Sequence, residues 1–80
     1  MNPEQLINAA AVAMERCKDR SVGTFKLLIR KGTLLCVPRT SSKPGDILIR
    51  SLTRWQLDHG FESESWNEIG KKLMTVFKES

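Results

Sequence analysis

Cys17, Cys36 and His59 are the side chains in this sequence best suited to bind a metal or to pair a nucleophile with an imidazole base. They are widely spaced and include no CxxC pair, whereas a structural zinc site usually takes four ligands. Asp58 adjoins His59, but neighbouring residues of a helix do not face each other. The sequence also lacks a glycine-rich phosphate loop and the GxSxG and HExxH motifs. We therefore expect no catalytic residue, no metal, no cofactor and no small-molecule substrate, and hence a protein that is not an enzyme.

The sequence starts without the features of a secretion signal, because it has neither a basic segment nor a long apolar segment near Met1. No apolar run approaches the roughly 20 residues that a membrane-spanning helix needs. These features predict a cytoplasmic protein that does not enter a membrane. In a reducing cytoplasm, Cys17 and Cys36 are expected to be free thiols rather than a disulfide.

Positive charge is concentrated in the middle of the sequence. The 80 residues carry 13 Lys and Arg against 9 Asp and Glu, a net charge of +4. Residues 16–54 hold ten of the basic residues against two acidic ones, a net charge of +8, and each flank has a net charge of −2. Such a segment attracts polyanions, of which nucleic acid is the commonest for a small domain. The candidate phosphate contacts lie in 18 residues without an acid and are Lys26, Arg30, Lys31, Arg39 and Lys43.

Other basic residues have simpler explanations. Those at 16–20 follow a predicted helix and complement the negative end of its dipole. In the row Asp46, Arg50, Arg54 and Asp58, each arginine has an acidic residue four positions away. That spacing favours ion pairs within a helix over contacts with phosphate.

The spacing of apolar residues and capping residues predicts three helices and one hairpin. Residues 3–19 have Asn2 as a helix cap, and residues 65–78 carry a capping-box pair, Ser65 and Glu68. Residues 25–30 and 33–37 alternate as two strands around Lys31 and Gly32, and residues 38–45 form a basic loop. Residues 46–59 are predicted as a helix, although the alternation of isoleucines near its start also suits a third strand. The predicted core is Leu6, Ala10, Met14, Leu27, Ile29, Leu34, Leu52, Trp55, Ile69, Leu73 and Phe77.

The predicted hairpin has apolar residues on both faces. Leu28, Leu35 and Val37 lie on the face opposite Leu27 and Ile29, and they need cover from a helix, a strand or a second subunit. Because an 80-residue chain has a small core, we favour a second subunit, and therefore a homodimer.

Together these patterns predict one small α+β domain over residues 1–80, in the order α-β-β-α-α, with an antiparallel hairpin packed on helices. The predicted function is a small basic nucleic-acid-binding protein, a non-enzymatic regulator or accessory factor of bacterial or phage type. The alternative is a protein-interaction module, an adaptor or inhibitor, that self-associates through its apolar hairpin. In that case an acidic protein surface is the partner of the basic segment.

Overall fold

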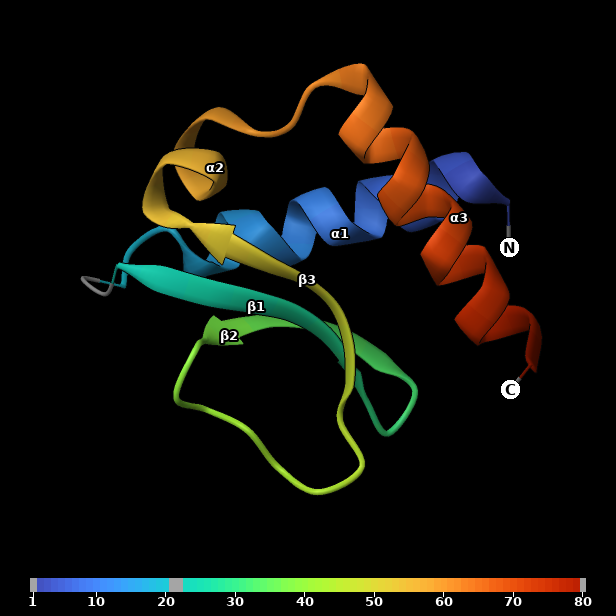
Figure 1. Ribbon diagram of the computed structural model, residues 1–80, viewed down its shortest axis with the longest axis horizontal. Helices are drawn as coiled ribbons and strands as arrows, with labels where there is room; N and C mark the ends of the chain where they lie inside the picture. The colour runs from blue at the N-terminus through green and yellow to red at the C-terminus, as the bar shows by residue number, and fades with distance from the viewer. Residues whose placement is uncertain (1, 21–22, 80) are drawn as a thin grey trace.

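The computed structural model describes residues 2–20 and 23–79, which form one three-stranded antiparallel sheet and three helices (Figure 1). The α+β class is confirmed, with a third strand in place of the first half of the second predicted helix. The elements are α1 (Pro3–Cys17), β1 (Thr24–Arg30), β2 (Thr33–Pro38), β3 (Ile47–Thr53), α2 (Arg54–His59) and α3 (Ser63–Glu79).

Helix α1 begins as the sequence predicts. The Asn2 side chain accepts a hydrogen bond from the Gln5 N–H at 2.9 Å, and the Gln5 side chain accepts one from the Asn2 N–H at 3.0 Å. This reciprocal pair satisfies two backbone donors that the first helical turn leaves open. The buried stripe of α1 faces the sheet and consists of Leu6, Ala10, Met14 and Cys17.

The hairpin of β1 and β2 also has the predicted register. Leu27 lies opposite Cys36, and Ile29 lies opposite Leu34. Lys31 and Gly32 form the turn with φ angles of +50° and +76°. Two positive φ angles define the type I′ turn, whose twist matches that of the strands it joins.

The helix predicted over residues 46–59 is wrong for its first half, which forms strand β3. This strand pairs with β1, with Thr24 opposite Thr53, and a bulge shifts the register near Leu27. The helix starts only after Thr53, whose hydroxyl accepts from the Gln56 N–H while the Gln56 side chain accepts from the Thr53 N–H. The β-branched alternation of Ile47 and Ile49 therefore indicated the strand, and the Thr53–Gln56 capping box marked the helix start.

Helices α1 and α3 cover one face of the sheet. Eight of the predicted core residues are buried there, namely Leu6, Ala10, Met14, Leu27, Ile29, Leu52, Ile69 and Leu73. Leu34 and Phe77 pack against this core while partly exposed. Trp55 is the exception, because 65% of its surface is exposed. Its assignment to the core was wrong, since it followed from a helical phase that strand β3 interrupts.

Helix α3 begins at Ser63, two residues before the predicted cap at Ser65. It crosses α1 at Gly70, where a Cβ atom would lie 3.2 Å from Cδ1 of Ile7. A glycine at this position lets the two helices approach closely.

Candidate nucleic-acid interface

Residues 39–46 cross the sheet on the face opposite the helices. Strands β2 and β3 flank β1 and are both antiparallel to it, so they run parallel to each other. Strand β2 ends beside Phe25, whereas β3 starts beside Ile29. The connection must therefore return along the length of β1, and it appears in Figure 1 as the large loop below the sheet. We call this side of the sheet the loop face.

Arg30 anchors one end of this loop. Its Nε and NH2 groups donate to the two carboxylate oxygens of Asp46, each at 2.8 Å, and NH2 also donates to the Ser41 carbonyl at 2.9 Å. The hydrogen bond from Arg30 lowers the pKa of Asp46 from 3.8 to about 2, and the Lys43 N–H, which also bonds to Asp46, adds to this effect. The same hydrogen bond raises the pKa of Arg30. Asp46 is therefore ionised and paired with a cation at neutral pH.

Lys26 anchors the loop at a second point, because its ammonium group donates to the Ser42 hydroxyl. Leu28 lies between Lys26 and Arg30 on the same face of β1 and is only 1% exposed. The chain's own loop therefore lies over the surface that we expected a second subunit to cover at Leu28. Leu35 and Val37, on the neighbouring strand, are partly exposed.

The five predicted phosphate contacts lie on β1, on the hairpin turn and in the loop, and they fall into two groups. Lys31 at the hairpin turn and Arg39 and Lys43 in the loop are exposed. Lys26 and Arg30 are partly buried and hold the loop. The Arg30 side chain, which the sequence analysis offered as a phosphate contact, is 17% exposed and ion-paired with Asp46.

The arginines at positions 50 and 54 lie on the helix side of the sheet. The predicted ion pairing within a helix is wrong for Arg50. Its guanidinium lies 3.6 Å from the Glu68 carboxylate and stacks over the Phe61 ring. It is confirmed for Arg54, whose Nε lies 3.2 Å from the Asp58 carboxylate. Arg54 also donates to the carbonyl oxygens of Lys18 and Arg20, and so joins α2 to the end of α1.

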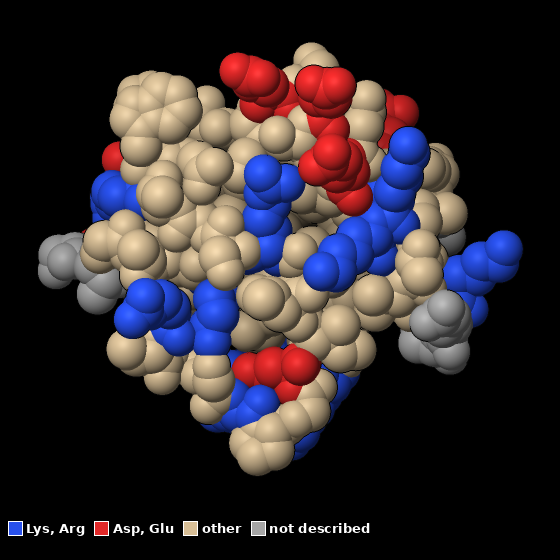
Figure 2. Space-filling model, in the orientation of Figure 1, with Lys and Arg blue, Asp and Glu red and all other residues tan. Residues whose placement is uncertain are grey.

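Acidic and basic side chains occupy different parts of the surface. Figure 2 shows acidic side chains gathered over the α2–α3 connection and the start of α3, and basic side chains spread over the sheet and the loop. The acidic residues of that connection and helix start are Glu62, Glu64 and Glu68. Residues 24–48, by contrast, carry five cations and one carboxylate, that of Asp46.

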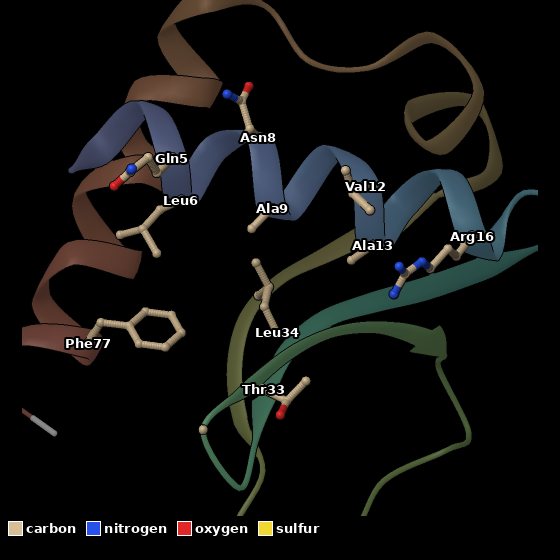
Figure 3. A pocket seen from close by; sticks show the side chains of 11 residues that line it. Gln5, Leu6, Asn8, Ala9, Val12, Ala13, Arg16, Thr33, Leu34 and Phe77 are labelled. Carbon is tan, nitrogen blue, oxygen red and sulfur yellow. The ribbon is translucent and has the colours of Figure 1, made fainter. Parts of the chain in front are cut away.

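An apolar groove runs between α1 and the outer edge of β2. Its volume is about 560 Å³, and one end is lined by Arg16. Figure 3 shows apolar side chains from α1, β2 and α3 around it, namely Leu6, Ala9, Val12, Ala13, Leu34 and Phe77. Val12 is 52% exposed. Among the described strands, β2 pairs with β1 alone, so this groove borders a sheet edge.

The two thiols are free, as the sequence analysis expected. Burial raises the pKa of Cys36 to about 12, and the neighbouring thiol of Cys17 adds to this shift. Such a thiol carries almost no nucleophilic thiolate at neutral pH. No cluster of three or more potential metal ligands occurs in residues 2–20 and 23–79.

His59 stacks on Trp55, an arrangement that the sequence analysis missed. The two ring centroids are 4.5 Å apart, and the planes differ by 13°. The spacing of four residues within residues 54–59 was visible in the sequence, but the assignment of Trp55 to the core hid its meaning.

Comparison with protein-family models, curated proteins and solved structures finds no match for this chain. Within the described residues, none of the helices has the length and apolar character needed to cross a membrane.

Proposed function

We propose that this chain is a small, non-enzymatic nucleic-acid-binding protein whose loop face contacts the phosphate backbone. The observation that supports this most is the charge of that face. Lys31, Arg39 and Lys43 are exposed there, while Asp46, the carboxylate among them, is neutralised by Arg30. When exposed cations without competing acids contact phosphates, the counterions condensed on the nucleic acid are released. This release makes binding favourable at low salt.

Lys31 gives this proposal independent support from backbone conformation. It adopts a φ angle of +50°, at a turn position where asparagine or glycine fits better. A left-handed conformation costs a non-glycine residue roughly 1–2 kcal/mol. A lysine here therefore supplies a cation at the tip of the hairpin despite a conformational cost.

The proposed contact is to the backbone and does not read base sequence. Lysine acts as a compact charge, and arginine can bind phosphate through two donors. Contacts of this kind position a protein on nucleic acid without specifying the sequence. We infer a regulator or accessory factor of the cytoplasm, a compartment in which Cys17 and Cys36 remain reduced.

A salt titration tests the proposal. Fluorescence anisotropy would measure the binding of labelled duplex DNA, single-stranded DNA and RNA between about 20 and 300 mM salt. Three phosphate contacts on duplex DNA predict a slope of about −2.7 for log K against log salt. Lys31→Ala combined with Lys43→Ala should flatten that slope by about 1.8.

The matched control removes two exposed lysines from α3, as Lys71→Ala combined with Lys72→Ala. It changes the net charge by the same amount but leaves the loop face intact, so the slope should stay within about 0.5 of the wild type. Equal effects of the two double variants would contradict a localised site. If the wild type binds none of the three nucleic acids at low salt, the proposal fails, and an acidic protein surface becomes the partner to seek by affinity capture.

Self-association is the second candidate function, and the groove beside β2 favours it. The two-residue turn directs the backbone groups of Leu34 and Cys36 away from β1, toward the open sheet edge. A second copy could pair there in an antiparallel, self-complementary manner. Sedimentation equilibrium of the wild type and of Val12→Lys tests this, because Val12 lies in the groove and is exposed. A wild-type monomer at about 50 μM would exclude a dimer of useful affinity.

A further inference from the structure

Trp55 is the most exposed of the large apolar side chains in the described part of the chain, at 65%. His59 lies one helical turn later and stacks on the indole, with ring centroids 4.5 Å apart and planes 13° from parallel. The His59 Nδ1 atom lies 3.0 Å from the Trp55 carbonyl oxygen and donates to it, which fixes the orientation of the imidazole. One face of the Trp55 indole is therefore covered by the His59 imidazole, whose orientation is fixed. Most of the remaining indole surface faces solvent.

The short helix that carries this stack is held at several points. The capping box of Thr53 and Gln56 closes its first turn, and Leu57 anchors it in the core at 2% exposure. Arg54 connects it to the carbonyl oxygens at the end of α1. A ligand that binds the Trp55–His59 stack therefore meets a surface whose order is established before binding, which reduces the entropic cost of association.

The stack lies at the same end of the sheet as Arg39. Thr53, the cap of α2, pairs with Thr24, and the Thr24 carbonyl accepts from the Arg39 N–H at 3.1 Å. Since adjacent strands are about 4.8 Å apart, the backbone of Arg39 lies roughly 10 Å from that of Thr53. A polymer chain that passes around this end of the sheet would therefore meet both the aromatic surface and the cation of Arg39.

The charges around the stack permit an anionic ligand. Asp58 is paired with Arg54, at 3.2 Å. Glu62 lines the hollow of about 310 Å³ beside Trp55 and is the exposed acid there. A nucleobase is neutral and can lie against the indole, while its phosphates follow the cations away from Glu62.

We propose that the Trp55–His59 stack binds an unpaired nucleobase, so that the ligand of the loop face is single-stranded nucleic acid. This inference rests on the proposed function and specifies its substrate class. Stacking needs an exposed base face, which a duplex offers only at its ends, and it accepts any base because every base has a π face. An aromatic surface beside a basic path is the combination that single-strand binding uses.

The experiment compares the binding of fluorescein-labelled dT12 with that of a labelled duplex of about 12 base pairs, at one low salt concentration. Polyethylene glycol linkers close both ends of the duplex, so it carries no unpaired base. Trp55→Ala should weaken dT12 binding about tenfold or more and leave duplex binding within twofold of the wild type. Trp55→Phe retains an aromatic face and should restore most of the affinity for dT12. Thr75→Ala, at an exposed position on α3 outside the stack and the loop, is the control and should change neither affinity.

Tryptophan fluorescence provides a second readout. Binding of unlabelled dT12 should quench wild-type emission, and Trp55→Phe, which leaves Trp66 as the single tryptophan, should abolish most of that quenching. The proposal is overturned if Trp55→Ala binds dT12 as tightly as the wild type, or if it weakens duplex and dT12 equally. If the protein binds in a salt-dependent way and Trp55→Ala does not alter that binding, the base contact alone is refuted. If the wild type binds neither nucleic acid, the proposed function is refuted as well.

Discussion

Arg30, the last residue of β1, binds both carboxylate oxygens of Asp46, the residue before β3, at 2.8 Å. Their side chains are 17% and 10% exposed, so water has limited access to the pair. The pair fixes the end of the loop that carries Arg39 and Lys43. One arginine that the sequence analysis assigned to phosphate binding therefore has a structural role, and it positions two of the cations that remain available.

Asp46→Asn is expected to lower the free energy of unfolding at pH 7, because it leaves the Arg30 guanidinium without an anionic partner. The effect should depend on pH. The pKa of Asp46 is lowered from 3.8 to about 2 in the folded protein, so its stabilising contribution is complete above about pH 5 and is lost as the pH falls toward 2. Urea unfolding at pH 7 and at pH 2.5 should show the wild type and the variant converging in acid.

Asp58→Asn is the matched control for that experiment, since it removes a carboxylate from a more exposed pair with Arg54. An exposed pair four residues apart contributes about 0.3–0.5 kcal/mol, so this variant should remain close to the wild type. A stability difference for Asp46→Asn that is the same at both pH values would show that its ionisation is not the cause.

Lys31→Asn is expected to separate binding from stability. Asparagine tolerates the φ angle of +50° better than lysine, so the variant should be more stable by about 0.5–1 kcal/mol in urea unfolding. The same change removes a cation and should flatten the salt slope for duplex DNA by about 0.9. Gly32→Ala, at a φ of +76°, is the contrasting variant and should be less stable while retaining the charge. A Lys31→Asn variant with unchanged affinity would exclude Lys31 from the interface.

The elements that the sequence predicted well are those set by capping or turn residues within a few positions of each other. Asn2 and Gln5 cap α1 directly, and Lys31 with Gly32 sets the hairpin register without help from the rest of the chain. Strand β3 was harder because its apolar residues fit both a helix and a strand. Its pairing with β1 decides between them, and that pairing joins residues more than 15 positions apart.

The same distinction applies to the site. The basic character of residues 26–43 could be predicted, because charge is a property of the sequence itself. The pairing of Arg30 with Asp46 could not, because it depends on the route of the loop across the sheet. The burial of Leu28 under that loop and the exposure of Trp55 follow from the same long-range arrangement.

Cys36 is expected to react slowly with alkylating reagents in the folded protein. Its pKa is raised from 9.0 to about 12 by burial and by the Cys17 thiol, so its thiolate fraction at pH 8 is about a thousandfold smaller than normal. Mass spectrometry after exposure to iodoacetamide should show little labelling of Cys36 until urea unfolds the chain. Labelling of Cys36 in native protein at the rate of a free peptide thiol would contradict the raised pKa of this partly buried thiol.

The raised pKa of Cys36 also predicts a loss of stability in alkali. The folded state favours the protonated thiol, so its stabilising effect is complete below about pH 8 and declines as the pH rises from about 9 toward 12. Cys36→Ala lacks this titration, and its unfolding free energy should fall less between pH 8 and pH 10.5. A parallel fall for the two proteins over that range would assign the alkaline loss to other groups.

Gly70→Ala is expected to stabilise the protein by about 0.5–1 kcal/mol. Alanine is the better helix former by roughly 1 kcal/mol in the interior of a helix such as α3. Its Cβ atom would lie 3.2 Å from Cδ1 of Ile7, a tight contact with the end of a flexible side chain. Ile7 is partly exposed and borders a hollow of about 450 Å³, so a small rotation of its side chain can relieve the contact.

Gly70→Val adds two further methyl groups at the crossing and should destabilise the protein. Urea unfolding of both variants tests the argument, and destabilisation by alanine would show that the α1–α3 crossing is too rigid to adjust.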